Sequence, residues 1–240
     1  MLDNEVVSIK VEGEFACFTR PDLKVERMSY PCMTPSAARG ILDSILWKPE
    51  FKWYVRRINV LKPVKYMSFK RNEINSKQNT APLVVDELNN QGKPKNRSQR
   101  NSIILKDVAY IIEASLYVDE YSEKNPPRKY VEMFKRRVKK GQCFRRPYLG
   151  TREFAAEFML PDNNDVLIQE TIPIGSMLFD IFYNESGLPE PVYFFDVAIK
   201  EGVLDCEVPE NDRLMKSSHI QPPLENEIQM QLKAIRSMEE

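Results

Sequence analysis

Histidine is almost absent from this chain of 240 residues. The single histidine, His219, lies in a polar stretch near the C-terminus with no glycine elbow beside it. A Ser-His-Asp triad would have to use this one residue. Nuclease sites built on two histidines, HExxH metal sites and His-rich metal clusters are excluded. We therefore expect His219 to be a solvated residue of a polar tail.

Paired cysteines and long apolar runs are also missing. The four cysteines are far apart and form no CxxC motif, so neither a zinc site nor a disulfide framework is indicated: Cys17, Cys32, Cys143 and Cys206. The chain contains no run of 18 apolar residues, so no transmembrane helix is predicted. Residues 1–5 lack the basic-then-apolar pattern of a signal peptide. We expect a cytoplasmic protein with no membrane partner, no metal and no cofactor.

The charge of the chain sums to zero but is divided between its two halves. Residues 1–155 carry 30 lysines and arginines against 18 acidic residues, a net of +12, whereas residues 156–240 carry 5 against 17. Lysine and arginine are densest in 48–77 and 121–153, and aromatic residues are interleaved in the second window. Bases bind phosphates, and aromatic rings stack on unpaired nucleobases. The pattern favours a nucleic-acid partner. A solvated basic face over core aromatics is the alternative, and the acidic half is expected to face protein or solvent.

Apolar periodicity predicts the elements of the first 160 residues. Alternating apolar residues favour strands over 6–18, 51–61, 108–118 and 154–160, with 64–77 as the arm of a hairpin and 86–102 as a mobile loop. Two helices are expected, one from Thr34-Pro35 to Pro49 and one over 128–140 that Gly141 closes. Trp47 and Trp53 are expected to be core residues. The order β-α-β-β-α-β is the ferredoxin-like arrangement.

The remaining third of the chain shows strand patterns before a polar end. Strands are expected over 177–183, 192–199 and 203–208, and a short helix over 224–238. We therefore predict an α+β protein in three parts. Residues 1–160 form a ferredoxin-like domain with a basic arm and loop at 64–102, residues 161–208 an antiparallel β-sheet extension, and residues 209–240 a polar tail.

Five short strings, in this order and spacing, carry a resemblance. They are GEFACFTRP (13–21), MTPSAARGIL (33–42), WKP (47–49), RNE (71–73) and YLGTREF (148–154). Each is weak by itself, but the set closely resembles the Cas-five family of CRISPR-associated proteins, Dvulg subtype, of type I-C systems. The resemblance runs from about residue 5 to about residue 208. It implies an RRM-like fold of the RAMP superfamily with a C-terminal β extension, in agreement with the periodicity.

The resemblance also implies a function and a set of partners. Members of the family bind the repeat-derived 5′ handle of CRISPR RNA at one end of the Cascade surveillance complex. There they contact the Cas-seven backbone subunit and the large subunit, and target DNA near the end of the complex is a further expected partner. In type I-C systems the protein also resembles the ribonuclease that processes precursor CRISPR RNA. That reaction needs no metal, because a ribose 2′-hydroxyl attacks the adjacent phosphate to give a cyclic phosphate and a 5′-hydroxyl.

The catalytic positions of the family are only partly matched. The family places an aromatic residue or histidine just before the WKP string and a Lys-His pair at the start of the second helix. Here these positions are Leu46 and Lys129-Tyr130. Leu46 can move no proton. Lys129 can neutralise a phosphate at a helix N-terminus, and Tyr130, with an ordinary pKa near 10, can serve as a weak acid, stack on a base or belong to the core.

Further bases are candidates for RNA contact. Arg39 follows two alanines on the first helix, where an RNA backbone can approach closely, and Lys70 and Arg71 lie on the arm. The other candidates are Arg20 and the bases around the end of the second helix: Arg136, Lys139, Lys140, Arg145, Arg146 and Arg152. Three hypotheses follow. The protein binds the handle and cuts the repeat, or it is a non-catalytic cap of Cascade while another ribonuclease cuts. A free-standing RNA-binding module is the third.

Overall fold

The longest strand, β4 (Arg97–Val118), organises the sheet of the computed structural model, which describes residues 6–76, 82–118, 126–183, 186–207 and 214–216. β4 pairs with β3 over residues 97–105, with β1 over 105–115 and with β2 over 110–118. Within the described residues nine strands form one sheet, in the order β5-β1-β4-β2-β8-β7-β6, with β3 paired to β4 and β9 to β7. All of these strand pairs are antiparallel.

The strands and helices follow the predicted order with some changes of extent. The elements are β1 (Val6–Ala16), η1 (Pro21–Leu23), α1 (Pro35–Ile45), β2 (Phe51–Val60), β3 (Tyr66–Ile74), β4, α2 (Pro127–Lys139), β5 (Glu157–Met159), β6 (Ile172–Tyr183), β7 (Pro189–Lys200), β8 (Val203–Asp205) and β9 (Leu214–Lys216). The strand expected over 154–160 is only three residues long, because Phe154 lies in a turn that pairs Tyr148 with Ala155. The α+β class is confirmed.

Helix α1 begins and is buried as the sequence predicts. The Thr34 side chain accepts a hydrogen bond from the Ala37 amide at 3.2 Å, and Pro35 occupies the first turn. Its apolar stripe, which includes Ile41 and Leu42, is fully buried against the sheet. At its other end three successive carbonyls accept hydrogen bonds from outside the helix, which satisfies groups that a helix terminus leaves open. The Ser44 carbonyl accepts from the amides of Phe144 and Arg145. The Ile45 carbonyl accepts from Arg137 Nη1, and the Leu46 carbonyl accepts from Trp53 Nε1.

Helix α2 packs against the sheet through aromatic rings. Tyr130 lies on Phe51 with ring centroids 4.9 Å apart, and Phe134 lies on Trp53 at the same separation. Tyr130, Val131, Phe134 and Val138, which share one side of α2 at helical spacing, are all buried. Trp53 is buried as expected, but the expectation for Trp47 is wrong, because its side chain is 63% exposed. Trp47 follows the last turn of α1, where the chain leaves the buried face of the helix.

A change of phase in the apolar pattern of β2 corresponds to a bulge. Phe51, Trp53 and Val55 are buried in one phase, and Ile58 and Val60 in the other. The β2–β4 register shifts between Val55 and Arg57, where one extra residue re-aims the strand. Both halves of β2 therefore contribute side chains to the same core.

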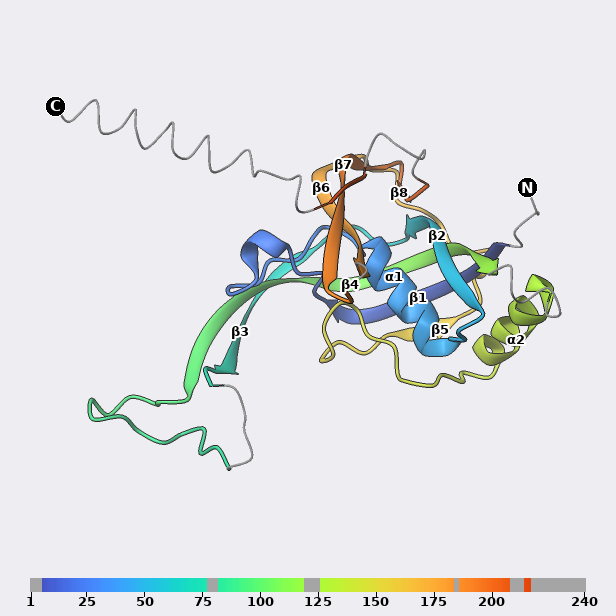
Figure 1. Ribbon diagram of the computed structural model, residues 1–240. Helices are drawn as coiled ribbons and strands as arrows, with labels where there is room; N and C mark the ends of the chain where they lie inside the picture. The colour runs from blue at the N-terminus through green and yellow to red at the C-terminus, as the bar shows by residue number, and fades with distance from the viewer. Residues whose placement is uncertain (1–5, 77–81, 119–125, 184–185, 208–213, 217–240) are drawn as a thin grey trace.

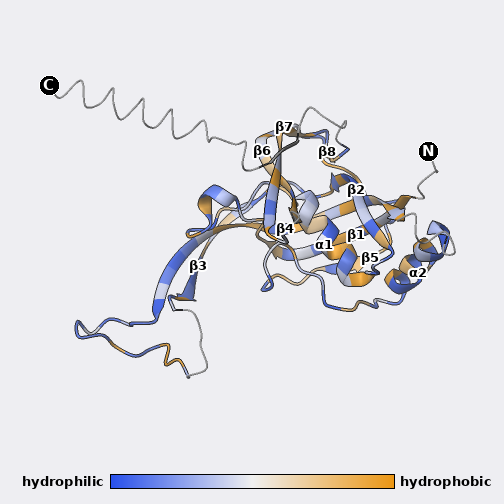
Figure 2. Ribbon diagram, in the orientation of Figure 1, coloured by the Kyte–Doolittle hydropathy of each residue, from blue (hydrophilic) through white to orange (hydrophobic). Residues whose placement is uncertain are grey.

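An arm projects from the body of the protein (Figure 1). It consists of β3 paired with residues 97–105 of β4. The prediction of a loop over 86–102 is wrong for residues 97–102, which are strand. The outer part of β4 is hydrophilic (Figure 2), because both faces of a two-stranded ribbon meet water and no apolar alternation is needed. This absence of alternation concealed the strand.

The strands after residue 170 extend the same sheet. β8 pairs with β2 through Ile58 and Leu204, and β7 pairs with β6, β8 and β9. These strands were expected and are present, with β6 beginning five residues earlier than predicted. The expected helix over 224–238 and His219 lie outside the described residues. Within the part of the chain that the structure covers, no helix is long and apolar enough to cross a membrane.

Candidate nucleic-acid interface

Three of the five strings converge on one pocket of about 390 Å³. One wall is the small-residue face of α1, and the others come from the end of β1 and from the loop 148–151. The lining residues are Phe18, Thr19, Arg27, Thr34, Ser36, Ala37, Gly40, Ile41, Ser44, Tyr148, Gly150, Thr151 and Leu178. Segments more than 100 residues apart in sequence therefore build a single concave surface.

The loop 148–151 reaches the end of β1 because it contains a glycine. The Cys17 amide donates to the Leu149 carbonyl at 3.0 Å. Gly150 has a φ of +86°, and a Cβ atom there would lie 2.0 Å from the Cys17 carbonyl oxygen. No side chain fits that position. Gly150 thus fixes the wall of the pocket by allowing two backbones to touch.

The glycine of α1 has a different surrounding. A Cβ atom at Gly40 would meet nothing within 4 Å. Helix packing in this chain therefore does not require glycine at that position, although glycine weakens a helix. Together with Ala37 and Ser44, Gly40 leaves only small side chains on the exposed side of α1. A ligand can approach the helix backbone there.

A strongly basic segment leads from α2 to this pocket. We call residues 139–146 the basic loop; its four bases are Lys139, Lys140, Arg145 and Arg146, and all are exposed. No acidic residue occurs between Met133 and Arg152. The chain then enters the pocket wall at Tyr148. The basic loop therefore places positive charge beside the pocket, where a phosphate backbone would be attracted.

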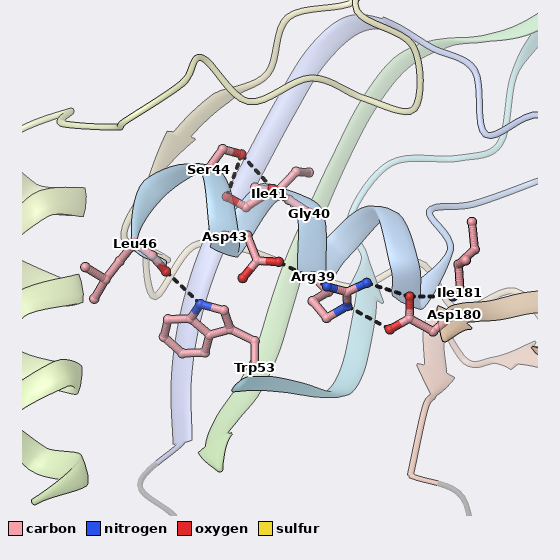
Figure 3. Close-up of polar contacts among 9 residues, drawn as sticks. All are labelled: Arg39, Gly40, Ile41, Asp43, Ser44, Leu46, Trp53, Asp180 and Ile181. Carbon is pink, nitrogen blue, oxygen red and sulfur yellow. Dashed lines mark hydrogen bonds and ion pairs between the residues drawn. The ribbon is translucent and has the colours of Figure 1, made fainter. Parts of the chain in front are cut away.

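Four of the predicted RNA-binding arginines have carboxylate partners among the described residues, and three of them lie outside the basic loop. Arg39 forms two hydrogen bonds of 2.7 Å to Asp180 on β6 and one of 3.1 Å to Asp43 (Figure 3). The hydrogen bonds to Asp180 raise the pKa of Arg39, whereas desolvation raises that of Asp43. Arg20 pairs with Asp22, and Arg71 with Glu73 and Glu153. These arginines hold α1, the 20–30 segment and the arm in place.

Most of the other predicted RNA-binding bases are exposed, and none but Arg146 is ion-paired to another described residue. Arg146 pairs with Glu157. The rest are Lys70 on the arm and Arg136, Lys139, Lys140, Arg145 and Arg152 near the end of α2. Five of these six lie within residues 136–152, the segment that runs from the last turn of α2 through the pocket wall. This surface is the best-formed candidate for phosphate contact.

The predicted catalytic pair lies at the other end of α2. Lys129 is exposed in the first turn, with Nζ 5.9 Å from the centroid of the Tyr130 ring. Tyr130 is only 2% exposed, and its burial, with a smaller effect of Glu50, raises its pKa. Lys129 and Lys139 are ten residues apart, which corresponds to about 15 Å along a helix. The structure therefore does not bring the catalytic candidates and the basic loop into one cluster.

Other groups that could transfer a proton lie in different surroundings. Leu46 is 1% exposed and belongs to the core. Glu50 Oε2 is buried and has no hydrogen-bond partner among the described residues. Glu132 is exposed on α2, and Tyr148 is half-buried in the pocket. Glu123 lies outside the described residues. Among those that are described, no group of three histidine, cysteine or acidic side chains is placed to hold a metal ion.

Several residues of the site were not found by sequence reasoning. Asp180 and Asp43 neutralise Arg39, but Asp180 is 141 residues away and no local pattern links the two. Arg137 was not a candidate, yet its guanidinium donates to the Ile45 carbonyl at 2.6 Å and joins α2 to α1. The helical spacing could have separated Arg137, which is half-buried, from its exposed neighbour Arg136.

Comparisons with known proteins cover most of the chain. The family described as CRISPR-associated protein (Cas_Cas5) matches residues 6–188. A protein of Thermus thermophilus named CRISPR pre-crRNA endoribonuclease Cas5d is 43% identical over 215 residues, which are 83% of this chain and 90% of the relative. A protein of the same name from Mannheimia succiniciproducens is 40% identical over 220 residues, 83% of this chain and 93% of the relative.

Solved structures resemble the chain in fold. One described as "Crystal Structure of CRISPR-associated Protein" matches with a TM-score of 0.63 and 22% identity, over 88% of this chain and 97% of the other. At that identity the likeness concerns the fold alone. The family match nevertheless takes in the pocket, the basic loop and α2.

Proposed function

This chain belongs to the Cas5d family of CRISPR-associated proteins, and we propose that it binds CRISPR RNA and processes its precursor. Both relatives that are at least 40% identical are named pre-crRNA endoribonucleases. The observation that carries the proposal is the convergence of three family strings on one pocket beside an acid-free basic loop. Such a surface suits a single strand whose phosphates need cations and whose bases need a recess.

The proposal includes the architecture. The strand order β5-β1-β4-β2, with α1 and α2 as the crossovers, supports a ferredoxin-like unit for residues 1–160. β3 and the start of β4 are then an insertion that forms the arm. Residues 161–208 are proposed as the β extension, and 209–240 as a polar tail. The sheet is continuous from β2 to β8, so the extension rests on the first unit rather than on a linker.

The partners follow from the same family. We place the protein in a type I-C Cascade complex in the cytoplasm, bound to the repeat-derived 5′ handle of CRISPR RNA. It would contact the Cas7-type backbone subunit and the large subunit, with target DNA near that end of the complex. The exposed arm and the basic loop provide separate surfaces for such contacts (Figure 1).

The proposed reaction uses the RNA as its own nucleophile. The 2′-hydroxyl oxygen attacks the adjacent phosphorus, the bond from phosphorus to the 5′ oxygen breaks, and a 2′,3′-cyclic phosphate and a 5′-hydroxyl result. The proton from the 2′-hydroxyl goes to a base, and the 5′ oxygen gains one from an acid. Lys129, exposed at the start of α2, is suited to neutralise the charge that develops on the phosphate. Tyr130 is a neutral phenol at pH 7, as its ordinary pKa near 10 requires, and burial raises that pKa further.

Two observations favour a second candidate function, a non-catalytic cap that binds the handle. Leu46 and Tyr130, which occupy the catalytic positions of the family, are both buried in the core. The Tyr130 ring is packed on Phe51 and would have to leave that contact to reach RNA. In this case another ribonuclease cuts the repeat, and the family's RNA-binding surface remains.

One experiment separates the two candidates. Purified protein is incubated with its labelled cognate repeat RNA in excess chelator and analysed on a denaturing gel, beside Lys129→Ala and the exposed control Lys135→Ala. For the ribonuclease we expect one cut without metal, lost at least 100-fold in Lys129→Ala and kept in Lys135→Ala. Intact RNA in a sample that a gel shift shows to be bound would establish the cap and refute the ribonuclease.

A further inference from the structure

Phe144 presents its aromatic ring to solvent in the middle of the basic loop. Its side chain is 86% exposed, more than any other large apolar side chain among the described residues. Phenylalanine is usually buried, because removing its surface from water is favourable. A ring at this position gains nothing from the fold of the isolated chain. Its exposure therefore requires a reason outside the core.

The backbone under this ring is held in place. The amides of Phe144 and Arg145 both donate to the carbonyl of Ser44, at 2.8 and 3.2 Å. The Ser44 hydroxyl in turn donates to the Gly40 carbonyl (Figure 3), and the Arg137 guanidinium donates to the next carbonyl, that of Ile45. The backbone of Phe144 is thus hydrogen-bonded to the C-terminal end of α1, at Ser44, which also lines the pocket.

The charged residues nearest to Phe144 along the chain are all basic. Lys140 precedes it and Arg145 follows it, and neither pairs with an acidic side chain among the described residues. An apolar partner protein would gain from the ring but would have to cover these cations as well. A single-stranded nucleic acid offers both complements, a flat base for the ring and phosphates for the cations.

We propose that Phe144 is a stacking platform for an unpaired base of RNA, held between phosphates that bind Lys140 and Arg145. The inference rests on the proposed function and assigns part of the RNA interface to one side chain. The stacked nucleotide lies beside the small-residue face of α1, so that a neighbouring nucleotide can reach the pocket. Phe144 touches RNA without taking part in proton transfer.

The test is the affinity for labelled repeat RNA of wild type, Phe144→Ala, Phe144→Leu and Phe144→Tyr. Base–aromatic stacking lowers the dissociation constant by about 5-fold to 150-fold per base. We expect a loss of that size in Phe144→Ala, a similar loss in Phe144→Leu, and recovery in Phe144→Tyr. Tyr117→Ala, which removes a ring that is 62% exposed on β4, is the matched control and should bind like wild type.

Cys143 gives an independent readout. It is exposed, whereas Cys17, Cys32 and Cys206 are buried, so a maleimide reports on the residue next to Phe144. Saturating repeat RNA should slow this labelling at least threefold in wild type and in Phe144→Tyr. Unchanged affinity in Phe144→Ala, full affinity in Phe144→Leu, or unprotected Cys143 would overturn the stacking role while RNA binding stands. A wild-type protein that does not bind the RNA would refute the proposed function itself.

Discussion

Three bases on β1, α1 and the arm differ in one respect from three bases on α2 and the basic loop. The first group is ion-paired with carboxylates: Lys10 with Asp165, Arg39 with Asp180, and Arg71 with Glu73. In the second group, Arg136, Lys140 and Arg145 are exposed, and none pairs with an acidic side chain in the described residues. Similar residue types therefore have different uses. The first group stabilises the fold, and the second is available to a ligand.

The divided charge of the chain has a structural counterpart. Four ion pairs join bases of residues 1–155 to acids of residues 156–240: Lys10–Asp165, Arg39–Asp180, Arg56–Glu207 and Arg146–Glu157. The acidic half was expected to face protein or solvent; Glu157 and Glu207 are exposed, but Asp165 and Asp180 are 8% and 16% exposed and are covered by this chain itself. Opposite charges separated along the sequence meet where the second half of the chain folds onto the first. A charge count thus overstates the surface available to RNA.

The largest effect is expected from breaking the pair of Arg39 with Asp180. Arg39→Ala leaves two carboxylates, 16% and 27% exposed, without their cation. We expect the free energy of unfolding to fall by about 2–3 kcal/mol and the melting temperature by about 5–10 °C. Urea and thermal unfolding measure this. The double variant Arg39→Ala/Asp180→Ala should recover part of the loss, and equal stability of Arg39→Ala and wild type would contradict the assignment.

The pair of Lys10 with Asp165 gives a smaller effect that depends on pH. The hydrogen bond from Lys10, 2.5 Å long, lowers the pKa of Asp165, helped by the Asp162 amide. A carboxyl whose pKa is lower in the folded than in the unfolded protein stabilises the fold at any pH above its unfolded pKa of about 3.9. That stabilisation is lost as the pH falls through the folded pKa. Asp165→Asn should cost about 1–2 kcal/mol at pH 7 and at pH 5. The difference in free energy of unfolding between the variant and wild type, measured by urea unfolding, should become smaller towards pH 3. A larger difference at pH 3 than at pH 7 would refute this role of Asp165.

Much of the fold could be predicted because its signals are local. Thr34 with Pro35, the closing Gly141 and the change of phase in β2 each specify backbone geometry within a few residues. The strand over 97–102 could not be predicted, because a solvated ribbon carries no apolar alternation. The extent of the expected 154–160 strand was also missed, since a turn at Phe154 interrupts its pattern.

The candidate site was predictable only as a set of residue types. The strings around Thr19, Gly40 and Gly150 mark the pocket, and the basic window marks the loop. Whether an arginine is available depends on contacts far along the chain, as with Arg39 and Asp180. Such facts belong to tertiary structure and leave no trace in local sequence.

The most direct test of the difference between the two groups is the salt dependence of binding to repeat RNA. Dissociation constants are measured from about 50 to 300 mM salt for wild type, Lys140→Ala/Arg145→Ala and Arg39→Ala, at a temperature where all are folded. Each phosphate contact with a single strand contributes about 0.7 to the slope of log K against log salt. We predict a slope smaller by about 1.4 for the double variant and an unchanged slope for Arg39→Ala. The reverse result would contradict the division into fold-stabilising and RNA-binding bases.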